Sequence, residues 1–151
     1  MGSVHVRAHG EVPPERFVAA LTDFGPGRDE VWGNSDPGHL VVHDRGGTWA
    51  EVTEGGGGGV WQRLRYDWSV PGRVTLDVLE SNAFGPGSRW TYLVESDGAG
   101  GCHVDLRIVR VPSTIRGRVL DVLLDLAGRA YFARDLRRSL RRLESRQRAP
   151  S

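Results

Sequence analysis

The sequence predicts an α+β fold: a curved antiparallel sheet of six to seven strands wrapped around a long C-terminal helix, with two short helices after the first strand. Two observations predict it. The stretch from Ile115 to Arg146 contains no proline and repeats apolar residues at the three-and-four spacing of a helix face. The part before it holds six or seven short strand-like runs separated by turn-forming residues. Because the sheet and the helix each have an apolar side, we expect them to pack together and to leave a cavity between them.

The first elements are a strand and two short helices. Val4–Ala8 alternates apolar with polar residues, which is typical of a half-buried strand. Pro13-Pro14-Glu15 is expected to open a helix, because proline and acidic residues are favoured in the first helical turn. Gly25-Pro26-Gly27 ends that helix, and Asp29–Trp32 is expected to form one more helical turn.

Six further strands and the long helix complete the chain. The strands are expected at Leu40–Asp44, Thr48–Thr53, Val60–Ser69, Arg73–Ser81, Ser88–Ser96 and Cys102–Val111. Pro112 ends the last strand, and the helix is expected to begin near 113–115 and to end near 142–146.

The lengths of three hairpin loops predict how the strands pair. We assign the loops to 70–72, 83–87 and 97–101, where glycine and proline gather. These registers place one set of large apolar side chains on a single face of the sheet, toward the helix. The predicted pairs include Tyr66 with Leu76, Val78 with Tyr92, and Trp90 with Ile108.

Composition limits the class of protein. The 151 residues suffice for one domain with a sizeable core, which we expect over 1–151 with 147–151 as a disordered tail. A formal net charge of +1 gives no electrostatic case for a nucleic-acid partner. The single cysteine, Cys102, excludes an internal disulfide, and no run of residues has the length of a membrane span. These features predict a soluble, cytoplasmic protein.

Several short segments are familiar from one superfamily. They are Val12-Pro13-Pro14-Glu15-Arg16-Phe17, Gly47-Thr48-Trp49, Arg65-Tyr66-Asp67-Trp68, Pro71-Gly72-Arg73-Val74 and Gly117-Arg118. With the order of elements, they make nearly the whole chain similar to the START-like or Bet v 1-like (SRPBCC) superfamily, whose fold is the helix-grip fold. The bacterial polyketide cyclase/dehydrase branch is the part of the superfamily that it resembles. None of these segments is a catalytic signature, so the resemblance implies a scaffold that serves cyclases, lipid carriers, hormone receptors and proteins without a known ligand.

Four polar residues are expected at one end of the apolar face: Gln62, Glu80, Asn82 and Arg110. Arg110 is a candidate to hold an enolate or carboxylate, and Glu80, removed from water, is a candidate to transfer protons. We predict that the two meet beside the pocket as a catalytic pair. The alternative is a partly solvated ion pair at the rim of the sheet, with a structural role only.

Apolar and aromatic residues are expected to line the cavity. Five tryptophans in this length indicate either a stacking-lined pocket for a flat ligand or an ordinary aromatic core, and both interpretations stay open. The candidate ligand-binding residues are Gln62, Tyr66, Trp68, Leu76, Val78, Asn82, Trp90, Tyr92, Leu106, Ile108, Leu123 and Leu126, with Trp32 and the 83–87 loop as a gate.

Other chemistries find little support. The Gly55–Gly59 run lacks the Lys-Ser/Thr of a phosphate loop, and no serine lies in a G-x-S-x-G motif. The arginines near the C-terminus are expected to form a solvated helix end. Without helical pairing or cysteine neighbours, the five histidines indicate no metal site, and we expect no metal or cofactor; they are His5, His9, His39, His43 and His103.

Different functions stay open on this scaffold. The first is an enzyme that binds a hydrophobic or aromatic small molecule, polyketide- or lipid-like, and promotes its cyclisation or dehydration, as the resemblance implies. The second is a non-catalytic carrier or sensor of such a ligand, and a third is a protein-interaction module. Ionisable groups that converge inside the cavity would favour the enzyme.

Overall fold

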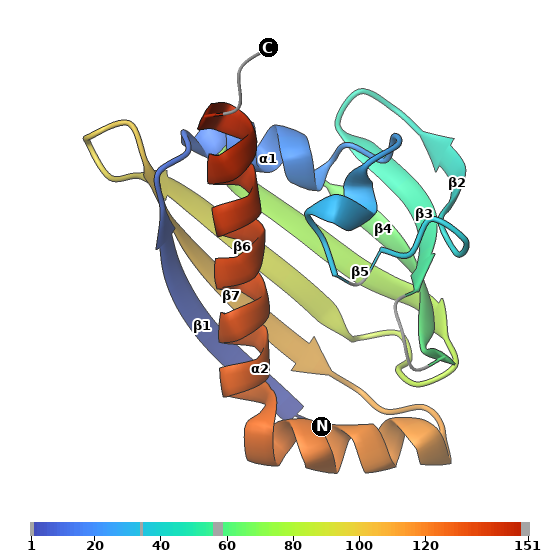
Figure 1. Ribbon diagram of the computed structural model, residues 1–151. Coiled ribbons are helices and arrows are strands. Elements are labelled where there is room, and N and C mark those ends of the chain that lie inside the picture. Colours follow the sequence, from blue (N-terminus) through green and yellow to red (C-terminus); the bar gives the residue numbers. More distant parts are fainter. Residues whose placement is uncertain (1, 34, 56–58, 149–151) are drawn as a thin grey trace.

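The computed structural model describes residues 2–33, 35–55 and 59–148. In these residues a seven-stranded antiparallel sheet has the strand order β1-β7-β6-β5-β4-β3-β2 and curves around helix α2 (Figure 1). The strands are β1 (Gly2–Gly10), β2 (Val41–Arg45), β3 (Trp49–Gly55), β4 (Trp61–Asp67), β5 (Arg73–Ser81), β6 (Arg89–Ser96) and β7 (Cys102–Arg110). The helices are α1 (Pro14–Leu21) and α2 (Ile115–Arg148), with the 3-10 turn η1 (Arg28–Glu30) between β1 and β2.

The predicted α+β fold, the helix-grip arrangement, is therefore confirmed, with one difference after β1. Only the first of the two expected short helices is an α-helix, and the second is the single 3-10 turn η1. Gly27, with a φ of 90°, comes just before this turn, in a backbone conformation that favours glycine.

Alternation along the strands builds the core on the concave face. In β7, Cys102, Val104, Leu106 and Ile108 are buried, and the residues between them are not. Side chains from the second half of α2 cover this face; the buried hydrophobic ones are Phe132, Leu136, Leu140 and Leu143. The core thus lies between the concave face and the C-terminal part of α2.

Two of the three predicted registers are confirmed. Tyr66 pairs with Leu76 and Trp90 pairs with Ile108, as the loop lengths indicated. The pairing of β5 with β6 was wrong, because Tyr92 lies opposite Val74 rather than Val78. The register differs from the predicted one by an even number of residues. Because side chains alternate between the two faces of a strand, each one still lies on its expected face.

The cause of that shift is the connection after β5. It is longer than a five-residue hairpin loop and folds against the end of β7. The Gly85 amide donates to the Val111 carbonyl at 2.8 Å, and the Ser113 amide donates to the Ala83 carbonyl at 3.0 Å. Loop 82–88 is thereby held between β7 and the start of α2.

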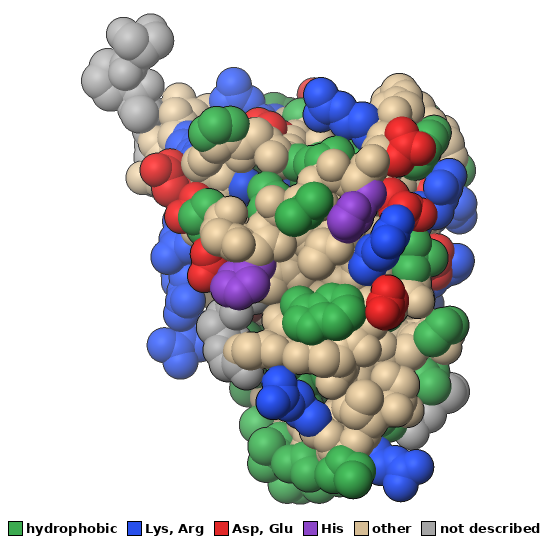
Figure 2. Space-filling view, turned by 90° about the vertical axis from the view of Figure 1, so that its right-hand side faces the viewer, with side chains coloured by type: hydrophobic (Ala, Val, Ile, Leu, Met, Phe, Trp, Pro, Cys, Tyr) green, Lys and Arg blue, Asp and Glu red, His purple; other side chains and the backbone are tan. Residues whose placement is uncertain are grey.

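Helix α2 is bent within its first half (Figure 1). The part before the bend lies beyond the end of the sheet, and the part after it runs along the concave face. The expectation that the whole apolar stripe from Ile115 packs on the sheet is therefore wrong for the first part, where Ile115 is 81% and Leu126 82% exposed. Figure 2 shows hydrophobic side chains gathered at this lower end of the molecule.

The end of α2 also differs from expectation. The helix continues to Arg148, so residues 147 and 148 are helical, and the rest of the expected tail lies outside the described residues. Residues 56–58 of the expected hairpin connection Gly55–Gly59 also lie outside them. No helix in the described part of the chain is long and apolar enough to cross a membrane.

Candidate functional site

A cavity of about 520 Å³ lies between the concave face of the sheet and the first half of α2. This size is within the range of pockets that hold drug-sized ligands. Its lining is mostly apolar and comes from β4, β5, β6 and β7, from the 82–88 loop and from α2. The apolar lining residues are Val60, Leu64, Val78, Phe84, Trp90, Ile108, Val109, Leu120, Leu123, Leu124, Ala127, Tyr131 and Phe132.

Polar residues contribute to the lining from two sides. Glu54 and Gln62 come from β3 and β4, while Ser88 and Arg110 belong to the region of β6 and β7. Strands β4, β5 and β6 lie between β3 and β7 in the sheet. Glu54 and Arg110 therefore reach the cavity from strands that are well separated across the sheet.

Arg110, the last residue of β7, is held by two carboxylates of α2. Its side chain is 3% exposed, its Nε donates to Asp121 Oδ1 at 2.9 Å, and its Nη2 donates to Asp125 Oδ1 at 2.7 Å. The two aspartates are four residues apart and so share one face of the helix. Arg110 Nη1 is buried and has no hydrogen-bond partner among the described residues. The arginine is thus fixed in place with one donor nitrogen unused.

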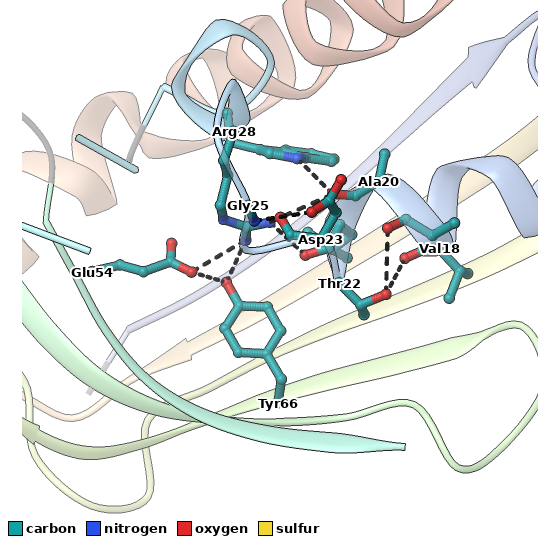
Figure 3. A network of polar contacts seen from close by, with 11 residues as sticks. Val18, Ala20, Thr22, Asp23, Gly25, Arg28, Glu54 and Tyr66 are labelled. Atoms are coloured by element: carbon teal, nitrogen blue, oxygen red, sulfur yellow. Dashed lines mark hydrogen bonds and ion pairs between the residues drawn. The ribbon is translucent and has the colours of Figure 1, made fainter. Parts of the chain in front are cut away.

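Glu54, near the end of β3, is the second buried ionic residue of the lining. Its side chain is 2% exposed, and its Oε1 accepts from Tyr66 Oη at 2.7 Å and from Arg28 Nη2 at 3.1 Å. Its Oε2 is buried without a hydrogen-bond partner among the described residues. Figure 3 shows Glu54 reaching both partners through one oxygen, with the other oxygen turned away from them.

Arg28 and Tyr66 keep Glu54 in this orientation. Arg28 Nη1 donates to the backbone carbonyls of Leu21 and Asp23, each at 2.8 Å, which fixes the guanidinium between the end of α1 and the sheet (Figure 3). Burial raises the pKa of Tyr66 well above its usual range, so its hydroxyl stays protonated and donates to the carboxylate. The Glu54 side chain is therefore positioned before any ligand binds.

Sequence reasoning missed Glu54, although a signal was present. Ala50 and Val52 are fully buried opposite the buried residues Tyr66 and Leu64 of β4, and the two-residue period of a strand places Glu54 on the same face. A carboxylate in phase with buried apolar residues indicates either a buried ion pair or a ligand contact. The three predicted hairpin loops join only the four strands after β3, so their lengths do not place Glu54.

The predicted meeting of Glu80 and Arg110 is wrong. A β-bulge in β5 places Val78 opposite Leu64 and Glu80 opposite Arg63, so that Leu79 is an extra residue. The bulge therefore turns Glu80 to the same face of the sheet as Arg63, and the Glu80 side chain is exposed. Arg110 pairs instead with Asp121 and Asp125.

The other predicted residues divide into cavity and core. Five of them line the cavity: Gln62, Val78, Trp90, Ile108 and Leu123. Tyr66, Leu76, Tyr92, Leu106 and Trp32 are buried in the core, Trp68 packs against it, and Leu126 is exposed outside the cavity. Asn82 holds its own loop, where its Nδ2 donates to the Gly59 carbonyl and its Oδ1 accepts from the Trp61 amide.

Aromatic side chains explain why part of the predicted pocket is solid. The ring centroids of Phe17 and Tyr92 are 6.0 Å apart, and those of Phe24 and Tyr66 are 4.9 Å apart. Trp32, the expected gate, packs edge-on against Phe17 and donates its Nε1 to the Ala20 carbonyl. The segment that follows β1 therefore fills one part of the concave face, and the cavity lies under the first half of α2.

The histidines remain peripheral. His5 and His9 contact Asp105 and Asp97 at 2.7 Å, and His43 contacts Thr53 Oγ1 at 2.7 Å, all on exposed parts of the surface. Across 2–33, 35–55 and 59–148, no group of three or more His, Cys, Asp or Glu side chains is arranged to hold a metal ion.

Comparison with known proteins agrees with this architecture. Residues 1–148 match the family model described as "Polyketide cyclase / dehydrase and lipid transport". No curated protein matches the sequence significantly.

Solved structures share the fold at low sequence identity. The ZhuI aromatase/cyclase from Streptomyces sp. R1128 is 16% identical with a TM-score of 0.78, covering 98% of this chain and 96% of its own. TTHA0849 from Thermus thermophilus is 18% identical with a TM-score of 0.74, covering 95% and 98%. A START superfamily protein from Mycobacterium smegmatis is 7% identical with a TM-score of 0.57, covering 85% and 93%. At such identities, these likenesses concern the fold alone.

Proposed function

The chain belongs to the polyketide cyclase/dehydrase and lipid-transport family, and on that premise we propose that it binds a hydrophobic or aromatic small molecule, polyketide- or lipid-like. The ligand occupies the cavity between the sheet and α2. The observation that carries the proposal is the cavity itself, about 520 Å³ with a mostly apolar lining and a fixed arginine at its edge. A ligand that buries roughly 250 Å² of apolar surface there would gain about 6 kcal/mol before the costs of association are subtracted.

Arg110 gives this proposal a chemical role. Its Nη1 has no hydrogen-bond partner among the described residues and belongs to a cavity-lining residue, so it suits the carbonyl oxygen of a ligand. Polarising the carbonyl that is attacked, while the cavity holds a poly-carbonyl chain folded, would promote aldol closure and dehydration. The name of the Streptomyces structure, an aromatase/cyclase, supports this chemistry for the fold.

A second candidate, a non-catalytic carrier or sensor, is favoured by the position of Glu80. The carboxylate expected to move protons is exposed and away from the cavity. Binding alone requires only the apolar lining and the fixed polar groups. The buried, unpaired Cys102 fits a reducing compartment, and we place either activity in the cytoplasm.

Tryptophan fluorescence tests ligand binding directly. Trp90 lines the cavity and packs edge-on against Phe132 at 5.3 Å between ring centroids. Titration with anthracene should quench or shift the emission in a saturable way, and Trp90→Phe should remove most of that response. Trp49→Phe is the matched control, because Trp49 lies on the other face of the sheet with Arg65 over its ring. A broad panel of flat apolar molecules without any saturable response would refute the proposal.

Turnover separates the enzyme from the carrier. The protein is incubated with the N-acetylcysteamine thioester of a linear poly-β-ketone, and cyclised or dehydrated products are followed by mass spectrometry against the uncatalysed reaction. An enzyme raises their rate and fixes one cyclisation pattern. A carrier binds the thioester and leaves both rate and pattern unchanged.

A further inference from the structure

We propose that the cavity selects a ligand with polar groups at both ends, a carbonyl oxygen at Arg110 and a hydroxyl group at Glu54, joined by an apolar middle. This inference rests on the proposed function and names the class of ligand. The structural basis is the pair of unused polar atoms, Arg110 Nη1 and Glu54 Oε2, on two residues that both line the cavity.

Unused buried polar atoms are uncommon in folded proteins, and each one needs an explanation. Four buried side-chain polar atoms lack a hydrogen-bond partner among the described residues, and two of the four belong to residues that line the cavity. One of these is a donor and the other an acceptor. Their chemistry therefore defines what a ligand must present at each place.

Glu54 is suited to accept a hydrogen bond from a ligand. Its Oε1 is already shared by Arg28 and Tyr66, and its charge is balanced by the buried guanidinium of Arg28. A neutral hydroxyl at Oε2 would complete the hydrogen bonding of the carboxylate without adding charge. Gly33 and Gly55 line the cavity as well, and neither has a side chain that would block the approach.

Arg110 is suited to donate to a neutral carbonyl rather than to a carboxylate. Asp121 and Asp125 already place two acidic groups against its guanidinium. A ligand carboxylate would add a third negative charge at this place, whereas a ketone or ester oxygen would accept from Nη1 without that repulsion.

The distance between the two residues requires separate polar groups on the ligand. From β3 to β7 the sheet has four strand spacings, which at about 4.8 Å each give roughly 19 Å along the surface, and less in a straight line across a curved sheet. One small polar head cannot reach both ends. Leu64, Val78 and Trp90, from the strands in between, line the cavity with apolar surface.

Four uncharged probes with the same chain test this selection. They are methyl ω-hydroxydodecanoate, methyl dodecanoate, 1-dodecanol and methyl ω-methoxydodecanoate, each titrated against tryptophan fluorescence. An added hydroxyl normally weakens binding to an apolar pocket, because it must lose its water. We expect the hydroxy ester to bind the native protein about tenfold more tightly than methyl dodecanoate or 1-dodecanol. A tenfold gain corresponds to the net free energy of a hydrogen bond to a charged group, after the cost of removing water from the hydroxyl is subtracted. The methoxy ester, which cannot donate, should gain nothing.

Glu54→Gln reverses the polarity of the atom that faces the ligand. The amide oxygen keeps the bonds from Arg28 and Tyr66, and an NH2 group takes the place of Oε2. The variant should no longer distinguish the hydroxy ester from the methoxy ester, because the oxygen of either group can accept from the amide NH2, and it should bind methyl dodecanoate as the native protein does. Glu51→Gln is the matched control: the same change in the same strand, on the opposite face, where Glu51 pairs with Arg63.

The outcomes separate the two levels of the proposal. If methyl dodecanoate binds the native protein as tightly as the hydroxy ester, the two-ended selection is wrong while the cavity remains a binding site. If none of the four probes gives a saturable response, the ligand-binding function itself fails and the inference fails with it. The comparison of probes on the native protein needs no variant, so a folding defect in Glu54→Gln cannot obscure the result.

Discussion

Arg28 and Glu54 form a buried ion pair, with 3.1 Å between Nη2 and Oε1 and both side chains almost completely removed from solvent. The pair joins the turn after α1 to strand β3 and at the same time orients the carboxylate that lines the cavity. Scaffold and candidate site therefore share one interaction. Its removal should therefore affect both the stability of the fold and the orientation of Glu54.

Arg28→Met should destabilise the protein by about 3–5 kcal/mol, because it leaves the Glu54 carboxylate buried without its counter-charge. The double variant with Glu54→Gln should recover a large part of the loss. Unfolding in urea, followed by circular dichroism, measures both. Arg63→Met is the control, since its pair with Glu51 is partly exposed and should be worth about 0–1 kcal/mol. Equal effects of the Arg28 and Arg63 changes would contradict this account.

Arg110→Gln combined with Asp121→Asn should weaken binding of methyl dodecanoate about tenfold, since it removes a charged donor to the ester carbonyl. Binding of dodecane, which has no carbonyl, should not change. The second substitution avoids leaving the buried Asp121 opposite a neutral side chain. Arg107→Gln in the same strand, with an exposed side chain, is the control. An equal loss for ester and hydrocarbon would instead indicate a general defect in the cavity.

Gly117→Ala should destabilise the protein by about 1–3 kcal/mol, despite the better helix propensity of alanine. A Cβ atom at this position would collide with the Ala83 carbonyl oxygen, a backbone atom that cannot rotate away. Thermal unfolding measures the change. At Gly47 an added Cβ meets nothing within 4 Å, so Gly47→Ala should be close to neutral. A stabilised Gly117→Ala variant would show that the start of α2 is not packed on the 82–88 loop.

Asp97→Asn should reduce stability at neutral pH, with a loss that shrinks in acid. The hydrogen bond from His9, assisted by the backbone amides of Ala99 and Gly101, lowers the pKa of Asp97 to about 2. The unfolded value is about 3.9, so the carboxylate stabilises the fold above that pH, and this contribution disappears as the pH falls through 2. Urea unfolding between neutral pH and pH 2 gives the difference between the variant and the native protein. A difference that stays constant over this range would refute the assignment.

Asp135→Asn should have the opposite effect and stabilise the protein at neutral pH. Burial raises the pKa of Asp135 above its usual range, although Arg138 and Arg142 partly oppose this. A group whose pKa is higher in the folded state stabilises that state below its unfolded pKa, and the contribution is lost as the pH rises through the folded value. The neutral amide of the variant does not titrate and has no such loss. The free energy of unfolding of the variant should therefore exceed that of the native protein as the pH is raised, and the difference should vanish in acid. A variant less stable than the native protein at neutral pH would contradict this reasoning.

The sequence was informative where a repeating pattern decides the structure. Alternation of apolar residues placed Tyr66, Leu76, Trp90 and Ile108 on the concave face, and the phase survived even where the register of β5 and β6 was wrong. The site was harder to predict. The bulge at Leu79 moves Glu80 from the concave face to the opposite face of the sheet. The alternation of apolar and polar residues does not predict where such a bulge occurs.

Two other differences also have physical causes. Glu54 lies in β3, a strand whose register the three predicted hairpin loops do not define. The bend in α2 separates two helical segments with continuous apolar periodicity, so the pattern cannot tell which segment packs on the sheet and which remains exposed. Periodicity predicts a face, while the partner of that face depends on tertiary packing.

The position of β1 beside β7 has a consequence for how the protein is made. His5 contacts Asp105, a residue 100 positions further along the chain, and β1 has no other strand neighbour within the described sheet. During synthesis, the backbone groups of β1 therefore have no strand partner until β7 has left the ribosome. Pairing between such distant segments is slow, because a long loop must close before any contact forms. We expect closure of the sheet by β1 to be a late folding event, which makes a nascent chain stalled before β7 a natural substrate for chaperones.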